Sequence, residues 1–222
     1  MYRTTVFALL WALLIPLAAA PAAADSYVEG KDYVRLVDPV RPRNPAKIEV
    51  VEVFAYSCPH CYRFDPQVKA WKKGLPADVD FYYSPIVWND LAQFHAQMFY
   101  TAKALFKLDR LHDSFFKAVH EQNNMLNTPD KVFPLFAAQG VTRAQFDRVF
   151  NSDAISAQVL QAKSRALGYR IDGTPEMVVA GKFRVGASMG GRSLSEHDAH
   201  ARMLKVVDFL VEKERQTKKA AE

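Results

Sequence analysis

The sequence predicts a small α/β domain interrupted by an all-helical insertion, and three observations support this fold class. A β-branched and aromatic run at 48–56 leads into a Cys-x-x-Cys motif and a helical pattern, and a second strand pattern follows at 79–83. Over 90–168 the apolar residues recur only at helical spacing. Strand patterns then return at 176–179 and 183–185. One α/β unit is therefore split by a block of helices.

The start of the chain has the pattern of a cleaved secretory signal peptide. Residues 1–24 combine a positive Arg3, a mostly apolar core over 6–17 and three alanines at 22–24. We therefore expect a periplasmic protein in which residues 25–89 and 169–222 form the two parts of the α/β domain. Without Arg3 the formal net charge falls from +5 to +4, and the basic residues are dispersed. This mild charge excludes a nucleic-acid partner.

The first part of the α/β domain is expected to be a βαβ unit. The lead-in over 25–47 carries three prolines and reads as extended, with a short edge strand at 33–36. The buried strand at 48–56 is followed by a helix from about Cys58 to a stop at Gly74. With the strand at 79–83 this makes a right-handed unit whose reactive turn lies at the carboxyl end of the first strand.

The remaining elements are marked by capping signals. Thr128-Pro129 predicts a helix start, although Pro134 predicts that this helix is short or kinked. Thr142 opens a capping box, and Gly168 is a stop signal for the last helix of the insertion. The two strands near 180 form a hairpin. Ser195 is expected to cap a final amphipathic helix that gives way to a polar tail.

Cys58-Pro59-His60-Cys61 is the motif that carries chemistry. A cysteine at a helix N-terminus meets unsatisfied backbone N–H groups and the positive end of the helix dipole, which favour the thiolate. The thiolate is the nucleophile, and Cys61, one turn into the helix, can resolve a mixed disulfide. His60 adds a potential hydrogen-bond donor or positive charge beside Cys58. The motif therefore indicates a redox site.

Other uses of the two cysteines fit less well. A zinc site needs more thiolates or well-spaced histidines, and the chain has only these two cysteines. Haem attachment needs His after the second cysteine, where the chain has Tyr62. A structural disulfide over so short a loop would stabilise the fold little. His197 and His200 could bind a metal, but a solvated helix face is commoner at this spacing, so we expect no metal.

With these residues the sequence resembles the DsbA-like thiol-disulfide oxidoreductases of the thioredoxin superfamily. Cys-Pro-His-Cys after a buried strand, a helical insertion, and Gly-Thr-Pro before the hairpin follow the family's order over the whole mature chain. The resemblance implies a thioredoxin-like fold in which Cys58 is the exposed nucleophile and Cys61 the buried resolving thiol. It also implies that Thr174-Pro175 is a cis-proline loop that holds substrate, and that Glu52 is a buried proton relay. Alternation along the strand makes burial of Glu52 plausible.

The resemblance also implies an activity and partners. The Cys58–Cys61 disulfide would be donated to reduced, unfolded exported proteins by a monomer that needs no cofactor, and a DsbB-like quinone-linked membrane protein would restore it. Two alternatives stay open at this point. One is a disulfide isomerase or reductase, although such isomerases usually carry a dimerisation domain for which the lead-in leaves no room. The other is a peptide-binding chaperone whose Cys-x-x-Cys is structural.

Overall fold

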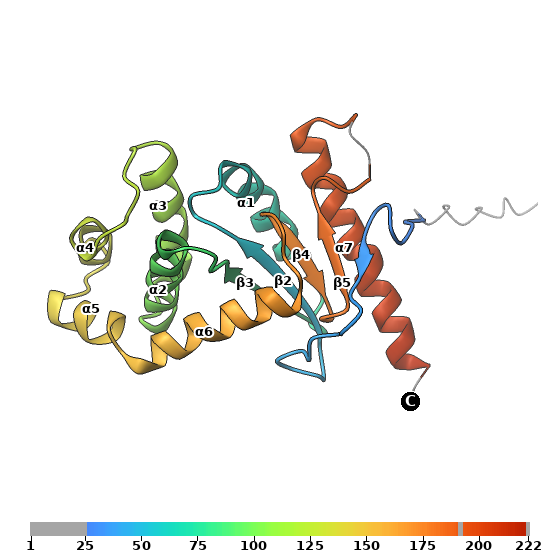
Figure 1. The fold of residues 1–222 in the computed structure, drawn as a ribbon, viewed down its shortest axis with the longest axis horizontal. Coiled ribbons are helices and arrows are strands. Elements are labelled where there is room, and N and C mark those ends of the chain that lie inside the picture. The colour runs from blue at the N-terminus through green and yellow to red at the C-terminus, as the bar shows by residue number, and fades with distance from the viewer. Residues whose placement is uncertain (1–25, 191–192, 221–222) are drawn as a thin grey trace, which may run out of the picture.

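The computed structural model describes residues 26–190 and 193–220, so the expected signal peptide over 1–24 lies outside the described residues. Within them the chain forms a mixed five-stranded sheet with helices on both faces and a group of helices at one end (Figure 1). The predicted fold class, an α/β thioredoxin-like fold with an inserted helical part, is confirmed.

The sheet is built around one completely buried strand. The strands are β1 (Val34–Arg35), β2 (Ile48–Phe54), β3 (Val79–Pro85), β4 (Glu176–Val179) and β5 (Phe183–Gly186). Their order is β1-β5-β4-β2-β3, with β2 parallel to β3 and antiparallel to β4. All seven residues of β2 are buried because neighbours and helices cover both its edges and both its faces. This strand ends beside the cysteine motif.

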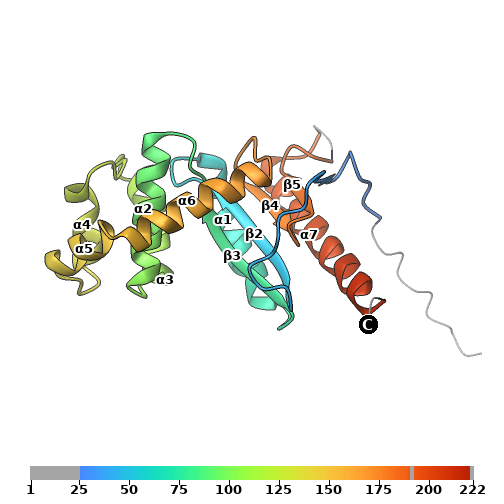
Figure 2. The ribbon, with the colours of Figure 1, turned by 60° about the horizontal axis from the view of Figure 1, so that its bottom comes forward.

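Helices cover the two faces of the sheet unequally. On one face, α1 (Pro59–Trp71) and α7 (Glu196–Lys219) pack through Phe64 and Leu210 against alternate strand residues. On the other, the C-terminal end of α6 (Asp153–Gly168) lies on the sheet, with Ala166 packed against Val51 and Val178. Figure 2 shows α6 running from the helical end of the molecule across the strands. A short 3₁₀ turn, η1 (Lys72–Gly74), closes α1.

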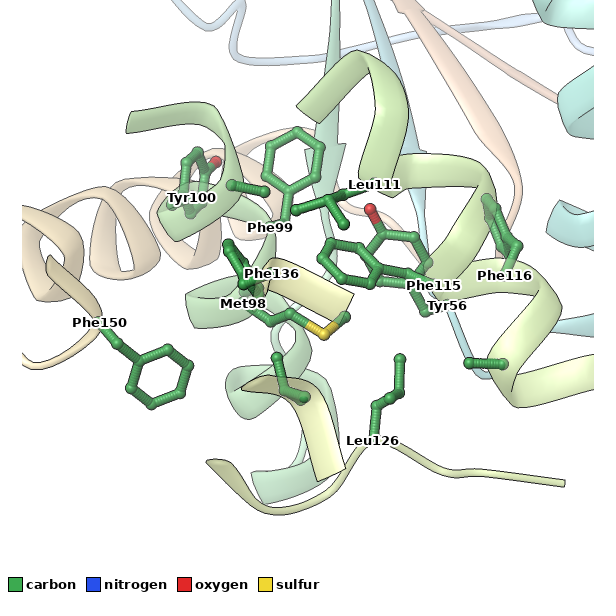
Figure 3. Packing of buried hydrophobic residues seen from close by; sticks show 14 of the residues in the cluster. Tyr56, Met98, Phe99, Tyr100, Leu111, Phe115, Phe116, Leu126, Phe136 and Phe150 are labelled. Atoms are coloured by element: carbon green, nitrogen blue, oxygen red, sulfur yellow. The ribbon is translucent and has the colours of Figure 1, made fainter. Parts of the chain in front are cut away.

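The helical part has an aromatic core of its own. Besides α6, its helices are α2 (Asp90–Ala104), α3 (Leu108–His120), α4 (Pro129–Ala137) and α5 (Arg143–Phe150). Thr128 caps α4, and Thr142 and Gln145 form the predicted capping box of α5. Figure 3 shows that the core also contains Tyr56, which reaches from the turn after β2 to Phe115 of α3. The reactive turn is thus packed against the helical part.

The largest difference from the predicted elements is the end of α7. Ser195 caps the helix as predicted, but the helix continues to Lys219 through residues expected to form a polar tail. Arg215 pairs with Asp78 at 2.7 Å, and Lys218 donates to two backbone carbonyls of the lead-in. These contacts hold the polar turns against the domain. None of the described helices is long and apolar enough to cross a membrane.

Candidate active site

Cys58 occupies the N-cap of α1, at the end of the reactive turn. Its backbone is extended, with φ −87° and ψ 117°, and Pro59 follows in the first helical position. Proline suits that position because it lacks an N–H and its fixed φ matches the helix. The backbone N–H groups of His60 and Cys61 are consequently free to hydrogen-bond the sulfur of Cys58. The structure shows both cysteines as free thiols, with Cys58 partly exposed and Cys61 buried.

Hydrogen bonds strongly favour the thiolate of Cys58. A hydrogen bond from the Cys61 side chain, which outweighs partial burial, lowers the pKa of Cys58 from 9.0 to about 5. The side chain of Thr174 and the backbone N–H groups of the first helical turn add to this lowering. At neutral pH the sulfur of Cys58 is therefore a thiolate when the pair is reduced.

Cys61 has the opposite environment. Its side chain is completely buried, and this burial raises its pKa well above 9.0. The hydrogen bond to Cys58 and the negative charge on that sulfur raise it further. Of the two thiols, Cys61 keeps its proton while Cys58 loses it.

Glu52 lies on β2 on the face that α1 covers. Its side chain is 2% exposed, and Oε2 has no hydrogen-bond partner among the described residues. Burial raises the pKa of Glu52 well above its usual range, and the nearby charge of Asp65 raises it further. An ionised Glu52 raises the pKa of Cys61, so the two groups lie within electrostatic reach of each other. Glu52 is therefore a buried carboxyl near Cys61 whose neutral, protonated form is favoured by burial.

The loop before β4 closes the site from the other side. The peptide bond between Thr174 and Pro175 is cis, the conformation that the resemblance implies. Sγ of Cys58 lies 3.2 Å from the carbonyl oxygen of Thr174, across 116 residues of sequence, and donates to it when the sulfur is protonated. His60, Thr174 and Pro175 also line one groove of about 330 Å³ that continues towards α7. The structure thus brings the cysteine motif and this loop together.

The His60 imidazole binds a carboxylate of α7. Its Nδ1 lies 2.7 Å from Oε1 of Glu196, at the start of α7, and Arg63 donates to the same carboxylate at 2.8 Å. His60 therefore reaches Cys58 through its backbone N–H, while its side chain links α1 to α7. His197 is exposed and His200 is buried. Across the described ranges, no group of three or more His, Cys, Asp or Glu side chains is placed to hold a metal ion.

Two histidines of α3 link the helical part to the reactive turn, and sequence analysis did not identify them. The hydroxyl of Tyr56 lies 2.8 Å from Nδ1 of His112, whose Nε2 faces Oδ1 of Asp65 at 3.3 Å. His120 donates through Nε2 to the backbone carbonyl of Tyr56 at 2.8 Å and stacks on Tyr62. The pattern of α3 shows that His112 lies next to an apolar stripe, but Tyr56 is 56 residues from His112 and 64 residues from His120. Two bonds thus hold the turn that carries Cys58.

A Cys-x-x-Cys pair at the start of the first helix of a thioredoxin fold, with one activated and one buried thiol, defines the thiol-disulfide oxidoreductases. The family model of the DSBA-like thioredoxin domain matches residues 77–196. The chain is 40% identical over 194 residues to the thiol:disulfide interchange protein DsbA of Pseudomonas aeruginosa, covering 87% of this chain and 89% of that protein. The chain belongs to the DsbA-like family.

Solved structures agree with this assignment. The crystal structure of Pseudomonas aeruginosa DsbA matches with a TM-score of 0.80 and 38% identity, over 87% of this chain and 97% of that one. The DsbA of Xylella fastidiosa matches with a TM-score of 0.77 and 33% identity, over 86% of this chain and 98% of that one. Among sequence relatives, the DsbA of Azotobacter vinelandii is also 37% identical, over 84% of this chain and 84% of that protein. The similarity therefore extends over nearly the whole described chain.

Proposed function

We propose that the chain donates a Cys58–Cys61 disulfide to newly exported proteins in the periplasm. The observation that carries this proposal is the opposite protonation of the two thiols, which makes the reduced pair stable at neutral pH. Each unit by which the pKa of the exposed thiol falls favours the reduced form by about 1.4 kcal/mol, or about 30 mV in a two-electron couple. DsbA proteins are themselves the standard example of this relation.

The first step is attack on the exposed sulfur. A substrate thiolate attacks Sγ of Cys58, the Cys58–Cys61 bond breaks, and a mixed disulfide forms through Cys58. The electron pair of the broken bond goes to Cys61, which is buried and binds a proton at once. Protonated Glu52 supplies that proton and regains it from solvent later. Glu52 is the proton relay in this proposal.

The second step releases the oxidised substrate. Its second thiolate attacks the substrate sulfur of the mixed disulfide, and Cys58 leaves as a thiolate. A thiol of low pKa is a good leaving group, so the environment of Cys58 accelerates this step. In total the substrate loses two electrons and two protons. Cys61 keeps one proton, and the other passes to solvent because Cys58 stays ionised.

The loop at Thr174 and Pro175 is proposed to hold the substrate. Its backbone faces Cys58 and borders the groove, so an extended peptide can lie along it like an added strand. A Proteus DsbA has been solved with a non-covalently bound peptide that contains a cysteine, which supports this role. Pro59 starts the helix that activates Cys58, and His60 supplies a backbone donor.

The remaining parts of the proposal rest on the family. The redox group is the cysteine pair itself, without a cofactor, in a monomer. A DsbB-like, quinone-linked membrane protein reoxidises it after each turnover. Residues 1–24 direct export, and residues 25–89 and 169–222 form the thioredoxin-like domain around the insertion at 90–168.

The test mixes the oxidised mature protein with a reduced peptide that carries two cysteines, in the absence of any other oxidant. Stoichiometric oxidation of the peptide, lost in Cys58→Ser, is expected. A scrambled-disulfide protein serves as the second substrate. If the peptide stays reduced while the scrambled protein is repaired by the reduced form, the chain is an isomerase. If neither reacts but unfolded peptide binds, the cysteines are structural and the chain is a binding protein.

A further inference from the structure

Arg184 is a charged side chain in a place where charge is costly. It lies on β5 between Phe183 and Val185, whose side chains enter the core under α7, so Arg184 points to the opposite face of the sheet. Only 11% of its side chain is exposed. A buried guanidinium needs partners that replace its lost hydration. The partners of Arg184 therefore indicate its role.

The partners of Arg184 lie on both sides of the loop that faces Cys58. Its Nη1 donates to the backbone carbonyl of Arg170 and lies 3.0 Å from Oδ2 of Asp172, both before the loop. The same nitrogen lies 3.5 Å from Oε2 of Glu176, the first residue after Pro175, a longer contact that is not a hydrogen bond. One guanidinium group thus binds the chain before the segment 173–175 and contacts the first residue after it.

Little else holds this segment. Ile171 donates to the carbonyl of Ala166, and β4 begins to pair with β2 and β5 at Glu176. Between these points, residues 172–174 form no backbone–backbone hydrogen bond within the described parts of the chain. The carbonyl of Thr174 nevertheless meets Sγ of Cys58 at 3.2 Å. The segment 172–174 therefore has a defined position opposite Cys58, although it forms few hydrogen bonds of its own.

The charges at Arg184 are balanced near neutral pH. Burial raises the pKa of Glu176 to about 8, against the opposing effect of Arg184. Glu176 is therefore mostly protonated at pH 7, and a hydrogen bond from it lowers the pKa of Asp172. The guanidinium then neutralises Asp172, while Glu176 takes part as a hydrogen-bonding group.

We propose that Arg184 is a positioning residue that holds the loop carrying Thr174 and Pro175 against Cys58, by binding Arg170 and Asp172 before the loop and packing against the Glu176 carboxyl after it. This inference rests on the proposed function, because it concerns how substrate is held beside the nucleophile. Without the guanidinium the loop becomes mobile relative to α1. Substrate then binds more weakly, and Cys58 loses part of the hydrogen bond from the Thr174 side chain that helps to lower its pKa.

The test compares Arg184→Met with Arg35→Met. Peptide oxidation is followed in turnover with glutathione disulfide supplied as the oxidant that takes the two electrons from the reduced pair, and the thiolate of Cys58 is titrated in the reduced protein. Arg35 is a matched control because it lies on the neighbouring strand β1, pairs with Glu29 and covers Phe183 without contacting the loop. For Arg184→Met we expect the KM for a dithiol peptide to rise about tenfold, the lower end of what losing a hydrogen bond to a charged group costs. We expect kcat to change less than KM, and the thiolate midpoint of Cys58 to move upwards.

Further variants separate positioning from folding. Glu176→Gln keeps a neutral hydrogen-bonding group and should resemble the unmodified protein at pH 7. Arg184→Lys, which keeps a charged nitrogen donor but not the planar guanidinium that places Nη1, should lie between Arg184→Met and the unmodified protein. If Arg184→Met does not fold, Asp172→Asn tests the same contact at a side chain that is 75% exposed, and it should raise KM in the same direction.

Two results would overturn the inference. One is an Arg184→Met protein that melts earlier but keeps the KM and thiolate midpoint of Arg35→Met, which would make Arg184 a purely structural residue. The other, if Arg184→Met does not fold, is an Asp172→Asn protein with unchanged KM. Failure of the proposed function would look different, because then the unmodified protein would not oxidise the peptide at all. The thiolate midpoint is measured without substrate and still reports on Arg184 in that case.

Discussion

The two ends of the Cys-Pro-His-Cys motif lie one helical turn apart and have opposite chemistry. At the surface end, Cys58 caps α1, faces Thr174 and has a pKa lowered to about 5 by hydrogen bonds that outweigh its partial burial. At the interior end, Cys61 is completely buried near Glu52, whose own pKa burial raises, and the pKa of Cys61 is raised as well. The same side chain therefore becomes a leaving group or a proton acceptor according to its burial and hydrogen bonding.

The largest expected effect separates the two cysteines directly. Cys58→Ser should abolish peptide oxidation, because Cys61 has no exposed surface that a substrate thiol can reach. Cys61→Ser should leave Cys58 able to react and should accumulate long-lived mixed disulfides, since the resolving thiol is gone. Non-reducing gels of both variants after exposure to a disulfide-containing peptide would show the difference. Identical patterns would contradict the division of roles.

Glu52→Gln alters only the interior end. We expect the attack that releases Cys61 to slow by about a hundredfold, the smaller effect typical of losing a positioned acid or base.

The same substitution should increase the stability of the protein. Because burial raises the folded-state pKa of Glu52, ionisation opposes folding above the unfolded pKa of about 4.5. The variant should therefore be the more stable protein at pH 7, with an advantage that grows as the pH rises towards the folded-state pKa. Stopped-flow oxidation and denaturant melts measure the two effects, and an equally fast variant would remove Glu52 from the mechanism.

The environment of Cys58 predicts that reduction stabilises the folded protein, the reverse of the usual effect of breaking a disulfide. A disulfide between Cys58 and Cys61 closes too short a loop to restrict the unfolded chain much. Reduction frees a thiolate that the folded protein stabilises. This contribution is full above the unfolded pKa of about 9 and is lost as the pH falls through about 5. At pH 7 about two units of the shift are in effect, and screening at the partly exposed sulfur reduces the gain to about 1–2 kcal/mol in favour of the reduced protein. Melts of both redox forms at pH 7 and pH 4 should show a gap that closes in acid. An oxidised form at least as stable at pH 7 would contradict this.

The smallest expected effect concerns His60. The imidazole of His60 binds Glu196, and its backbone N–H donates a hydrogen bond to the sulfur of Cys58. His60→Ala should therefore keep the hydrogen bond that lowers the pKa of Cys58. We expect the thiolate midpoint to rise by less than about one unit, through loosening of α7 against α1. Glu196→Gln, which removes the partner of the imidazole, is the matched control and should have a similar effect. A large shift in His60→Ala alone would show that the imidazole acts on the sulfur directly.

Local signals predicted most of the fold. The strand predicted at 48–56 and found at 48–54, the capping box at Thr142 and the cap at Ser195 all follow from side chains that act on their neighbours in sequence. The continuation of α7 to Lys219 was missed because Asp78 and the lead-in, which bind its last turns, are distant in sequence. Propensity alone favoured a polar tail there.

The candidate site likewise combines features that local sequence predicts with contacts that it does not. The spacing of the cysteines and the start of α1 are local features, and the alternation of β2 placed Glu52 on the face that α1 covers. The contact of Cys58 with Thr174 came only from the family resemblance. The links of Tyr56 to α3 and of Arg184 to the loop had no local signal, because each joins residues through tertiary packing.

The measurement that tests the difference between the two ends most directly is the pH titration of thiolate absorbance in the reduced mature protein. The first ionisation should have a midpoint near 5 and should disappear in Cys58→Ser, while Cys61 ionises only at alkaline pH. The oxidised protein, which has no free thiol, provides the baseline. A first midpoint near the value of about 8.5 for a free cysteine, or one that persists in Cys58→Ser, would contradict the activation of Cys58 from which the proposed function follows.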